Sequence, residues 1–208
     1  MNAFKPWFAA ALTAALLAAC AVSPSPAPVL LTLPPAAGPL AGTASPPSAP
    51  SSPGAPPLLA VRRVKIPEYL VARRVRYRTD ASTLAEWPNT YWAERIEIGV
   101  SREFASALRQ QLPGWTLCDT DCGDQLPALT LQVDLEPLDY LRSAHQLQAR
   151  ARITLSDAGV TPKALRTQEL AYEIASNGDT AQAQAQAMAQ LIRQVAAAAA
   201  PLIRAAKP

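Results

Sequence analysis

The 208-residue sequence is poor in the residues on which most catalytic sites depend, since it has one histidine and eight glycines. It contains no nucleophile elbow, phosphate-binding glycine loop or motif that pairs a histidine with a carboxylate. The lone His145 begins an alternating segment, and we interpret it as a surface residue. We therefore expect a protein without enzymatic activity, without a cofactor and without a metal site.

The chain also lacks blocks of like charge. Its 19 basic and 16 acidic residues are interspersed, so the composition does not favour a nucleic-acid partner. Residues 7–19 form a mostly apolar run, but this run is shorter than the roughly 20 residues that a transmembrane helix needs. Lys5 precedes the run and small residues close it, which is the organisation of a secretory signal peptide over residues 1–19.

Residues 17–20, Leu-Ala-Ala-Cys, resemble the lipobox of bacterial lipoproteins, in which the cysteine becomes the acylated first residue. An ordinary signal peptide that contains a cysteine, or a short transmembrane helix, is the alternative. The lipobox resemblance implies lipid chains on Cys20. Ala21 and Val22 follow, without the aspartate that signals retention in the inner membrane, so it also implies the periplasmic face of the outer membrane.

Residues 20–57 are rich in proline, alanine and serine, with twelve prolines from position 21 to position 57. Such a composition predicts an extended, semi-rigid tether, and residues 34–57 alone would reach roughly 70 Å if fully extended. Residues 29–33, Val-Leu-Leu-Thr-Leu, interrupt this pattern. They are either a first strand that docks on the domain or an apolar patch within the tether.

The remaining chain, residues 58–206, shows the periodicities of one folded α+β domain. Period-two alternation predicts strands, and apolar residues that recur every three to four positions predict two amphipathic helices. The predicted strands are 58–66, 71–78, 83–87, 115–118, 129–136, 147–155 and 170–174, and the predicted helices are 93–111 and a last one that begins after 177–180 and kinks or ends at Pro201. We expect a two-layer sandwich, with an antiparallel sheet and both helices on one face.

Two local irregularities accompany these strands. The alternation changes phase at Arg62-Arg63, which predicts a bulge of one extra residue. Pro88-Asn89-Thr90 is expected to interrupt the strand pattern before the first helix begins. Arginines at positions 74, 76 and 78 indicate either a surface for anionic lipid or a partner, or simply a solvated strand face, and we favour the solvated face.

Cys118 and Cys122 are separated by three residues and allow three interpretations. A metal site would need two further ligands, and a redox pair usually has closer cysteines at a helix N-terminus. We therefore favour a small structural disulfide.

The order of motifs resembles the ABC-type transport auxiliary lipoproteins, the PqiC-like group. The features that carry the resemblance are the lipobox, Ile66-Pro67-x-Tyr69-Leu70, the basic residues from Arg73 to Arg78 with the turn after Thr79, and Trp92-Ala93-Glu94. The chain departs from the family pattern in two ways. Val71-Ala72 replaces the acid that often follows Tyr-Leu, and the proline-rich insertion is long.

The resemblance implies a non-enzymatic subunit of an envelope lipid transport system. Its partners would be an MCE-domain periplasmic protein and the associated inner-membrane permease, and association with copies of itself stays open. Tyr69, Leu70 and Trp92 are the candidates for partner binding, with a structural role in holding the hairpin to the first helix as the alternative. The alternative function is a lipid or lipopolysaccharide carrier that binds acyl chains between sheet and helices.

Overall fold

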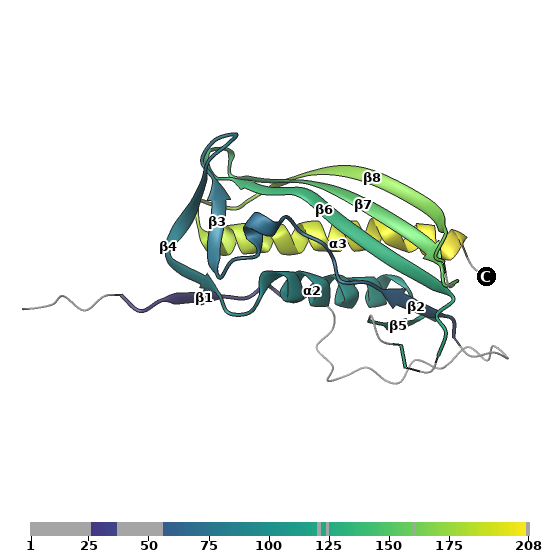
Figure 1. The fold of residues 1–208 in the computed structure, drawn as a ribbon. Coiled ribbons are helices and arrows are strands. Elements are labelled where there is room, and N and C mark those ends of the chain that lie inside the picture. The colour runs from purple at the N-terminus through teal and green to yellow at the C-terminus, as the bar shows by residue number, and fades with distance from the viewer. Residues whose placement is uncertain (1–25, 37–55, 120–121, 124, 160, 207–208) are drawn as a thin grey trace, which may run out of the picture.

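The computed structural model describes residues 26–36, 56–119, 122–123, 125–159 and 161–206 (Figure 1). The elements in chain order are β1 Val29–Leu31, β2 Leu58–Val61, the short 3-10 helix η2 Glu68–Leu70, β3 Arg74–Arg78, β4 Leu84–Trp92, α2 Ile96–Gln111, β5 Thr116–Cys118, β6 Leu129–Leu141, the short 3-10 helix η3 Arg142–Ala144, β7 Gln146–Asp157, β8 Ala164–Ala175 and α3 Ala181–Ala205. The eight strands form one sheet, and the predicted α+β class is confirmed.

The sheet is mixed, so the prediction of a purely antiparallel sheet was wrong in this detail. Neighbours joined by short turns are antiparallel, namely β3 with β4, β6 with β7 and β7 with β8. The parallel pairs are β1 with β4, β2 with β5, β2 with β6, and β3 with β6. The strands of each parallel pair are joined by longer crossing segments rather than by a tight turn.

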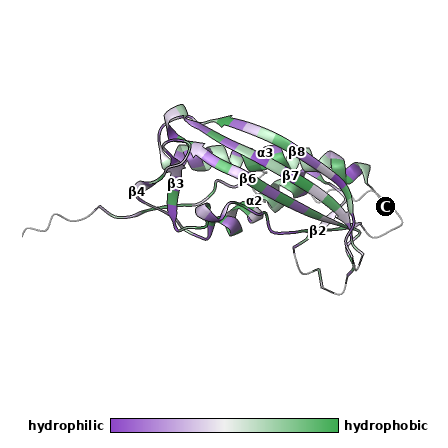
Figure 2. Cartoon of the chain, turned by 45° about the horizontal axis from the view of Figure 1, so that its top comes forward, coloured by the Kyte–Doolittle hydropathy of each residue, from purple (hydrophilic) through white to green (hydrophobic). Residues whose placement is uncertain are grey.

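Strand β6 organises the sheet. Its first residues pair with β2 and its last residue pairs with β3, while β7 lies along its other edge. Apolar and polar residues alternate along β6 and β7 (Figure 2). The apolar face is covered by α2 and α3, which pack against each other beneath the sheet (Figure 1). This arrangement is the predicted two-layer sandwich, and its core includes Leu131, Ile153 and Leu191 at 0% exposure.

Helix α3 begins where the sequence predicts. The Thr180 side chain accepts a hydrogen bond of 3.1 Å from the Ala183 backbone N–H, which is the geometry of an N-cap. The helix does not end at Pro201 but runs on to Ala205.

Residues 29–33 dock on the domain, so the strand interpretation of this segment is correct. Val29–Leu31 runs parallel to β4, and the Ala93 N–H donates a hydrogen bond of 2.8 Å to the Leu31 carbonyl. Leu31 and Leu33 are buried in the core at 8% and 3% exposure. The predicted signal peptide 1–19, Cys20 and residues 37–55 of the predicted tether lie outside the described residues, and their boundaries stay predictions.

The predicted extra residue after β2 is present. Val61 pairs with Leu131, and the next pair is Lys65 with Asp134. The chain therefore advances four residues after β2 while β6 advances three. The surplus residue lets both Val61 and Val64 point into the core at 6% and 2% exposure. The ladder is parallel, whereas the sequence led us to expect an antiparallel one.

Pro88-Asn89-Thr90 lies within β4, and the predicted break there was wrong. The register between β3 and β4 shifts at this point, because Arg76 pairs with Glu86 and Arg74 pairs with Tyr91. Asn89 has a φ of +48°, a left-handed conformation that asparagine tolerates better than most residues. The strand therefore accommodates the three residues as an irregularity and continues to Trp92.

Candidate partner-binding surface

The three residues predicted to bind a partner lie in different environments. Tyr69 and Leu70 belong to η2 and are half-buried, and Leu70 packs against the core. Trp92 closes β4 and is 4% exposed, within the hydrophobic core. The structural role that the sequence left open therefore applies to Trp92, while Tyr69 and Leu70 combine internal contacts with partial exposure.

Internal bonds fasten Tyr69 to two strands. Its hydroxyl donates a hydrogen bond of 2.9 Å to Oδ1 of Asp139 on β6, and the Arg78 Nε lies 2.8 Å from the same oxygen. The Arg76 guanidinium donates a hydrogen bond of 2.8 Å to the Tyr69 carbonyl. Burial is the main cause that raises the pKa of Tyr69 above its ordinary value, and the hydrogen bond to Asp139 acts in the same direction. The hydroxyl is thus already engaged and holds η2 in place.

Beside η2, a groove runs between the segment that follows β2 and the exposed side of α2. We call it the basic groove, and its cations are Arg62, Arg63, Lys65, Arg95, Arg102 and Arg109. Two adjoining cavities of about 300 and 720 Å³ make up the groove. Three acidic residues also line it, namely Glu68, Glu97 and Asp119.

Half of these cations already have acidic partners. Arg95 forms an ion pair with Glu97, Arg102 lies 2.6 Å from Glu94, and Lys65 lies 3.6 Å from Asp134. Among the described residues, no carboxylate forms an ion pair with the other three cations, which are Arg62, Arg63 and Arg109. Glu68 and Asp119 also lack an ion-pair partner among the described residues, so the three free arginines of the groove exceed its free carboxylates by one positive charge.

The sequence did not single out this groove. The phase change at Arg62-Arg63 is a usable signal, because a residue inserted into a ladder lets two successive side chains turn away from the core. Both arginines are in fact exposed between buried Val61 and Val64. The contribution of Arg109 depends on the approach of α2 to this segment.

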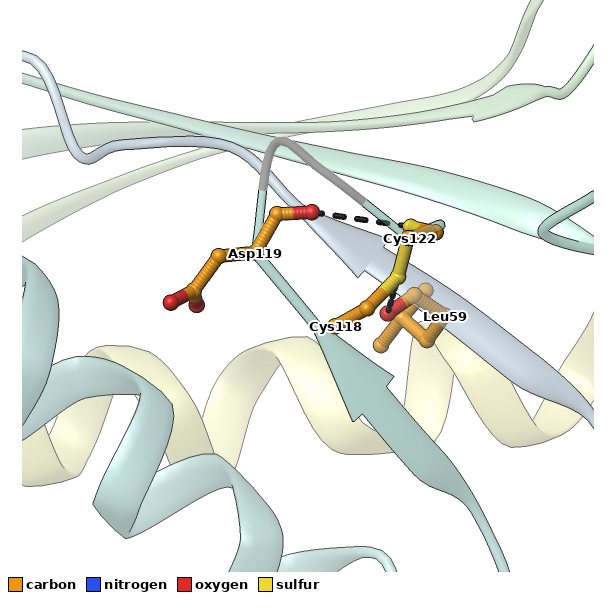
Figure 3. Close-up of a disulfide and its surroundings, with 4 residues drawn as sticks. All are labelled: Leu59, Cys118, Asp119 and Cys122. Atoms are coloured by element: carbon orange, nitrogen blue, oxygen red, sulfur yellow. Dashed lines mark hydrogen bonds between the residues drawn. A yellow bond between two sulfur atoms is a disulfide. The ribbon is translucent and has the colours of Figure 1, made fainter. Parts of the chain in front are cut away.

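The predicted disulfide between Cys118 and Cys122 is present and closes the end of β5 (Figure 3). The two Cα atoms are 5.3 Å apart, and the Cys118 Sγ lies 3.6 Å from the Leu59 carbonyl oxygen on neighbouring β2. The bridge holds this corner next to Asp119, which lines the end of the basic groove.

The described residues lack both a metal-binding group and a membrane-spanning helix. They contain no group of three or more histidine, cysteine, aspartate or glutamate side chains placed to hold a metal ion. None of their helices combines the length and the apolar character that crossing a membrane requires. Cys20 lies outside these residues, and its lipidation stays a prediction.

Comparison with known proteins places the chain in a family. A family model described as the ABC-type transport auxiliary lipoprotein component matches residues 40–200. No curated protein matches the sequence. One solved structure, an uncharacterized protein, has a TM-score of 0.66 at 19% identity and covers 85% of this chain and 99% of its own. Protein XCC0632 from Xanthomonas campestris has a TM-score of 0.57 at 14% identity, covering 84% of this chain and 90% of its own. At these identities the two structures show a shared fold.

Proposed function

Because the chain belongs to the family of ABC-type transport auxiliary lipoprotein components, we propose that it is a non-enzymatic subunit of an MCE/ABC-type intermembrane lipid transport system. In this role it is anchored through Cys20 to the periplasmic face of the outer membrane. It docks an MCE-domain periplasmic protein whose permease lies in the inner membrane, and it thereby supports the integrity of the envelope.

The observation that carries the docking role is the group of three arginines in the basic groove that have no ion-pair partner among the described residues and outnumber its two free carboxylates. Arg62 and Arg63 project from one wall and Arg109 from the other, without acidic partners among the described residues. Arginine forms bidentate pairs with carboxylates, so the groove favours an acidic segment of the partner. Such complementarity guides association and fixes the orientation of the two proteins. Tyr69 and Leu70 belong to η2, which borders the groove through Glu68.

The carrier function receives less support from the same structure. An acyl chain between sheet and helices would occupy the space that core side chains already fill, among them Leu131, Ile153 and Leu191 at 0% exposure. Protein interiors are close-packed, so an added acyl chain would require these side chains to rearrange. We therefore place the function at the surface of the domain.

The docking role is tested with the full-length lipoprotein and the purified periplasmic domain of the MCE protein from the same organism. We expect the double variant Arg62→Glu, Arg63→Glu to bind at least tenfold more weakly, and wild-type binding to weaken as salt is added. The control is Arg166→Glu with Arg193→Glu, which makes the same change in net charge on exposed positions of β8 and α3. Equal loss in both double variants, or no loss in either, would contradict the groove as the dock.

Anchoring is tested separately in cells. A Cys20→Ser variant should accumulate as a folded protein but should fail to restore resistance to detergents in a strain that lacks the gene. Full restoration by this variant would refute the anchored subunit, and acyl chains retained by the purified wild-type domain would favour the carrier instead.

A further inference from the structure

The chain is tied to the domain much earlier than its composition suggests. The Asn89 side-chain amide donates hydrogen bonds of 2.7 and 3.0 Å to the carbonyls of Pro26 and Ala27. β1 follows directly and pairs with β4. Further on, the Ala36 N–H donates a hydrogen bond of 2.9 Å to the Glu103 carboxylate on α2. From Pro26 to Ala36 the chain is therefore part of the folded domain.

Because of this docking, only residues 21–25 connect the domain to the membrane, if Cys20 carries the lipid as the proposed function requires. We call these five residues the membrane linker. Only five residues separate Cys20 from Pro26. A fully extended chain covers at most about 3.6 Å per residue, so the six steps from Cys20 to Pro26 cannot exceed about 22 Å. Residues 37–55 start from Ala36 and return to Pro56, both on the domain, so their length adds nothing to the reach.

The strands to which Pro26 and Ala27 lead carry a row of side chains on one face. Leu30 on β1 lies opposite Tyr91 on β4, which in turn lies opposite Arg74 on β3. The next residues along the three strands, Leu31, Trp92 and Val75, are at most 8% exposed, so the row of Leu30, Tyr91 and Arg74 occupies the outer face. We call it the Leu30 row.

The members of the Leu30 row are accessible. Leu30 is 55% exposed, its neighbour Val29 is 41% exposed, and these are two of the four large apolar residues that are exposed in the described part of the chain. The Arg74 guanidinium lies 5.2 Å from the centre of the Tyr91 ring, and half of the Arg74 side chain is exposed. Glu86 pairs with both Arg74 and Arg76 at 3.3 Å, so one carboxylate compensates two cations and positive charge is left over.

We propose that the Leu30 row rests against the phospholipid headgroups of the membrane that holds Cys20. An aliphatic side chain suits the boundary with the acyl chains, an aromatic ring suits the headgroup level, and an arginine suits the phosphates. The excess positive charge fits the negative charge of anionic phospholipids. The β1 end of the domain then faces the bilayer. The β2 and β5 end with the disulfide, at the other end of α2, points away from it (Figure 1).

The test uses the acylated full-length protein in vesicles of four parts phosphatidylethanolamine to one part phosphatidylglycerol, with nitroxide-labelled headgroups as quenchers. A fluorophore is placed at Thr32→Cys beside the Leu30 row, or at Leu126→Cys near the start of β6, and both native positions are exposed. We expect loss of most of the fluorescence at position 32 and no loss at position 126. Equal quenching at both positions, or quenching at position 126 alone, would overturn the orientation.

Further variants separate the effect of the Leu30 row from the effect of the short membrane linker, residues 21–25. Leu30→Glu should lower quenching at position 32, whereas Leu165→Glu, at another exposed leucine, should not. In the Leu30→Glu protein, a twelve-residue Gly-Ser insertion after Ser23 should lower the quenching at position 32 further. The same insertion after Ala44 should leave that quenching unchanged. If the Ala44 insertion lowered the quenching as much as the Ser23 insertion, the membrane linker would not be limited to residues 21–25.

Failure of this inference is distinguishable from failure of the proposed function. Intact mass and vesicle flotation report whether Cys20 is acylated, and an unmodified Cys20 would refute the anchor together with the orientation. An acylated, floating protein with the wrong quenching pattern would refute the orientation alone, and binding of the MCE domain is measured independently of both.

Discussion

The Tyr69 hydroxyl donates a hydrogen bond of 2.9 Å to the Asp139 carboxylate, which lies 70 residues further along the chain. Arg78 approaches the same carboxylate oxygen at 2.8 Å, and its guanidinium lies 5.3 Å from the centre of the Tyr69 ring. One acid thus joins η2, β3 and β6. The tyrosine of the Ile66-Pro67-x-Tyr69-Leu70 motif has a structural role whatever else this segment contacts.

Removing the hydroxyl of Tyr69 should destabilise the domain moderately. In Tyr69→Phe the ring stays in place, but Asp139 loses one of its two donors, and a hydrogen bond to a charged group in a partly buried site contributes about 1–2 kcal/mol. Tyr91→Phe is the matched control, because the Tyr91 hydroxyl forms no hydrogen bond with the described residues. Urea unfolding of the two variants measures the difference, and equal stabilities would show that the Tyr69 bond contributes nothing.

The same hydroxyl should make stability depend on alkaline pH. Burial raises the pKa of Tyr69 above its ordinary value near 10, so folding favours the neutral phenol. The resulting stabilisation is fully present below pH 10 and is lost as pH rises through the higher pKa of the folded state. The stability advantage of wild type over Tyr69→Phe should therefore be constant from pH 7 to 9 and should shrink above pH 10. Denaturation curves at successive pH values test this, and an advantage that does not change up to pH 11 would be inconsistent with it.

Docking of the segment that contains β1 should appear in the free energy of unfolding. Leu33 is 3% exposed, and truncation of a buried leucine costs about 2–5 kcal/mol, so Leu33→Ala should destabilise the whole domain. Leu30→Ala, at a residue 55% exposed, should change stability by no more than about 0.5 kcal/mol. Thermal or chemical unfolding of both variants is the measurement. If Leu33→Ala were as neutral as Leu30→Ala, residues 29–33 would be an undocked part of the tether.

A buried amide joins the last helix to the β3–β4 hairpin. Gln184 on α3 is 2% exposed, accepts a hydrogen bond of 2.7 Å from the Trp87 indole N–H and donates one of 2.7 Å to the Arg76 carbonyl. Gln184→Met keeps the shape of the side chain but leaves both partners unpaired, which should cost about 3 kcal/mol.

Gln186→Met is the control for this variant, since Gln186 is exposed on the same helix. It should change stability by less than about 0.5 kcal/mol. Chemical unfolding compares the two methionine variants, and a loss below about 1 kcal/mol in Gln184→Met would show that relaxation or water satisfies the freed groups.

Much of the fold was predictable from particular residues. The alternation from Leu129 to Leu135 and from Leu147 to Leu155 predicted β6 and β7, because one face of each strand is buried and the other is wet. The turn signals around Asn177 and the cap at Thr180 located the start of α3. Strand direction was not predictable, because a period of two records burial of one face and is the same for parallel and antiparallel neighbours.

By itself, the sequence determined the element types, the extra residue after β2, the favoured Cys118–Cys122 disulfide and the family resemblance, because these depend on local periodicity and short spacing. Only the tertiary structure decided that Trp92 is a core residue, that β1 docks on β4, and that Arg109 joins Arg62 and Arg63 across one groove. These facts depend on contacts between segments far apart in the chain, and local patterns do not record such contacts. For Cys20, that docking replaces a long predicted tether with the five residues that precede Pro26.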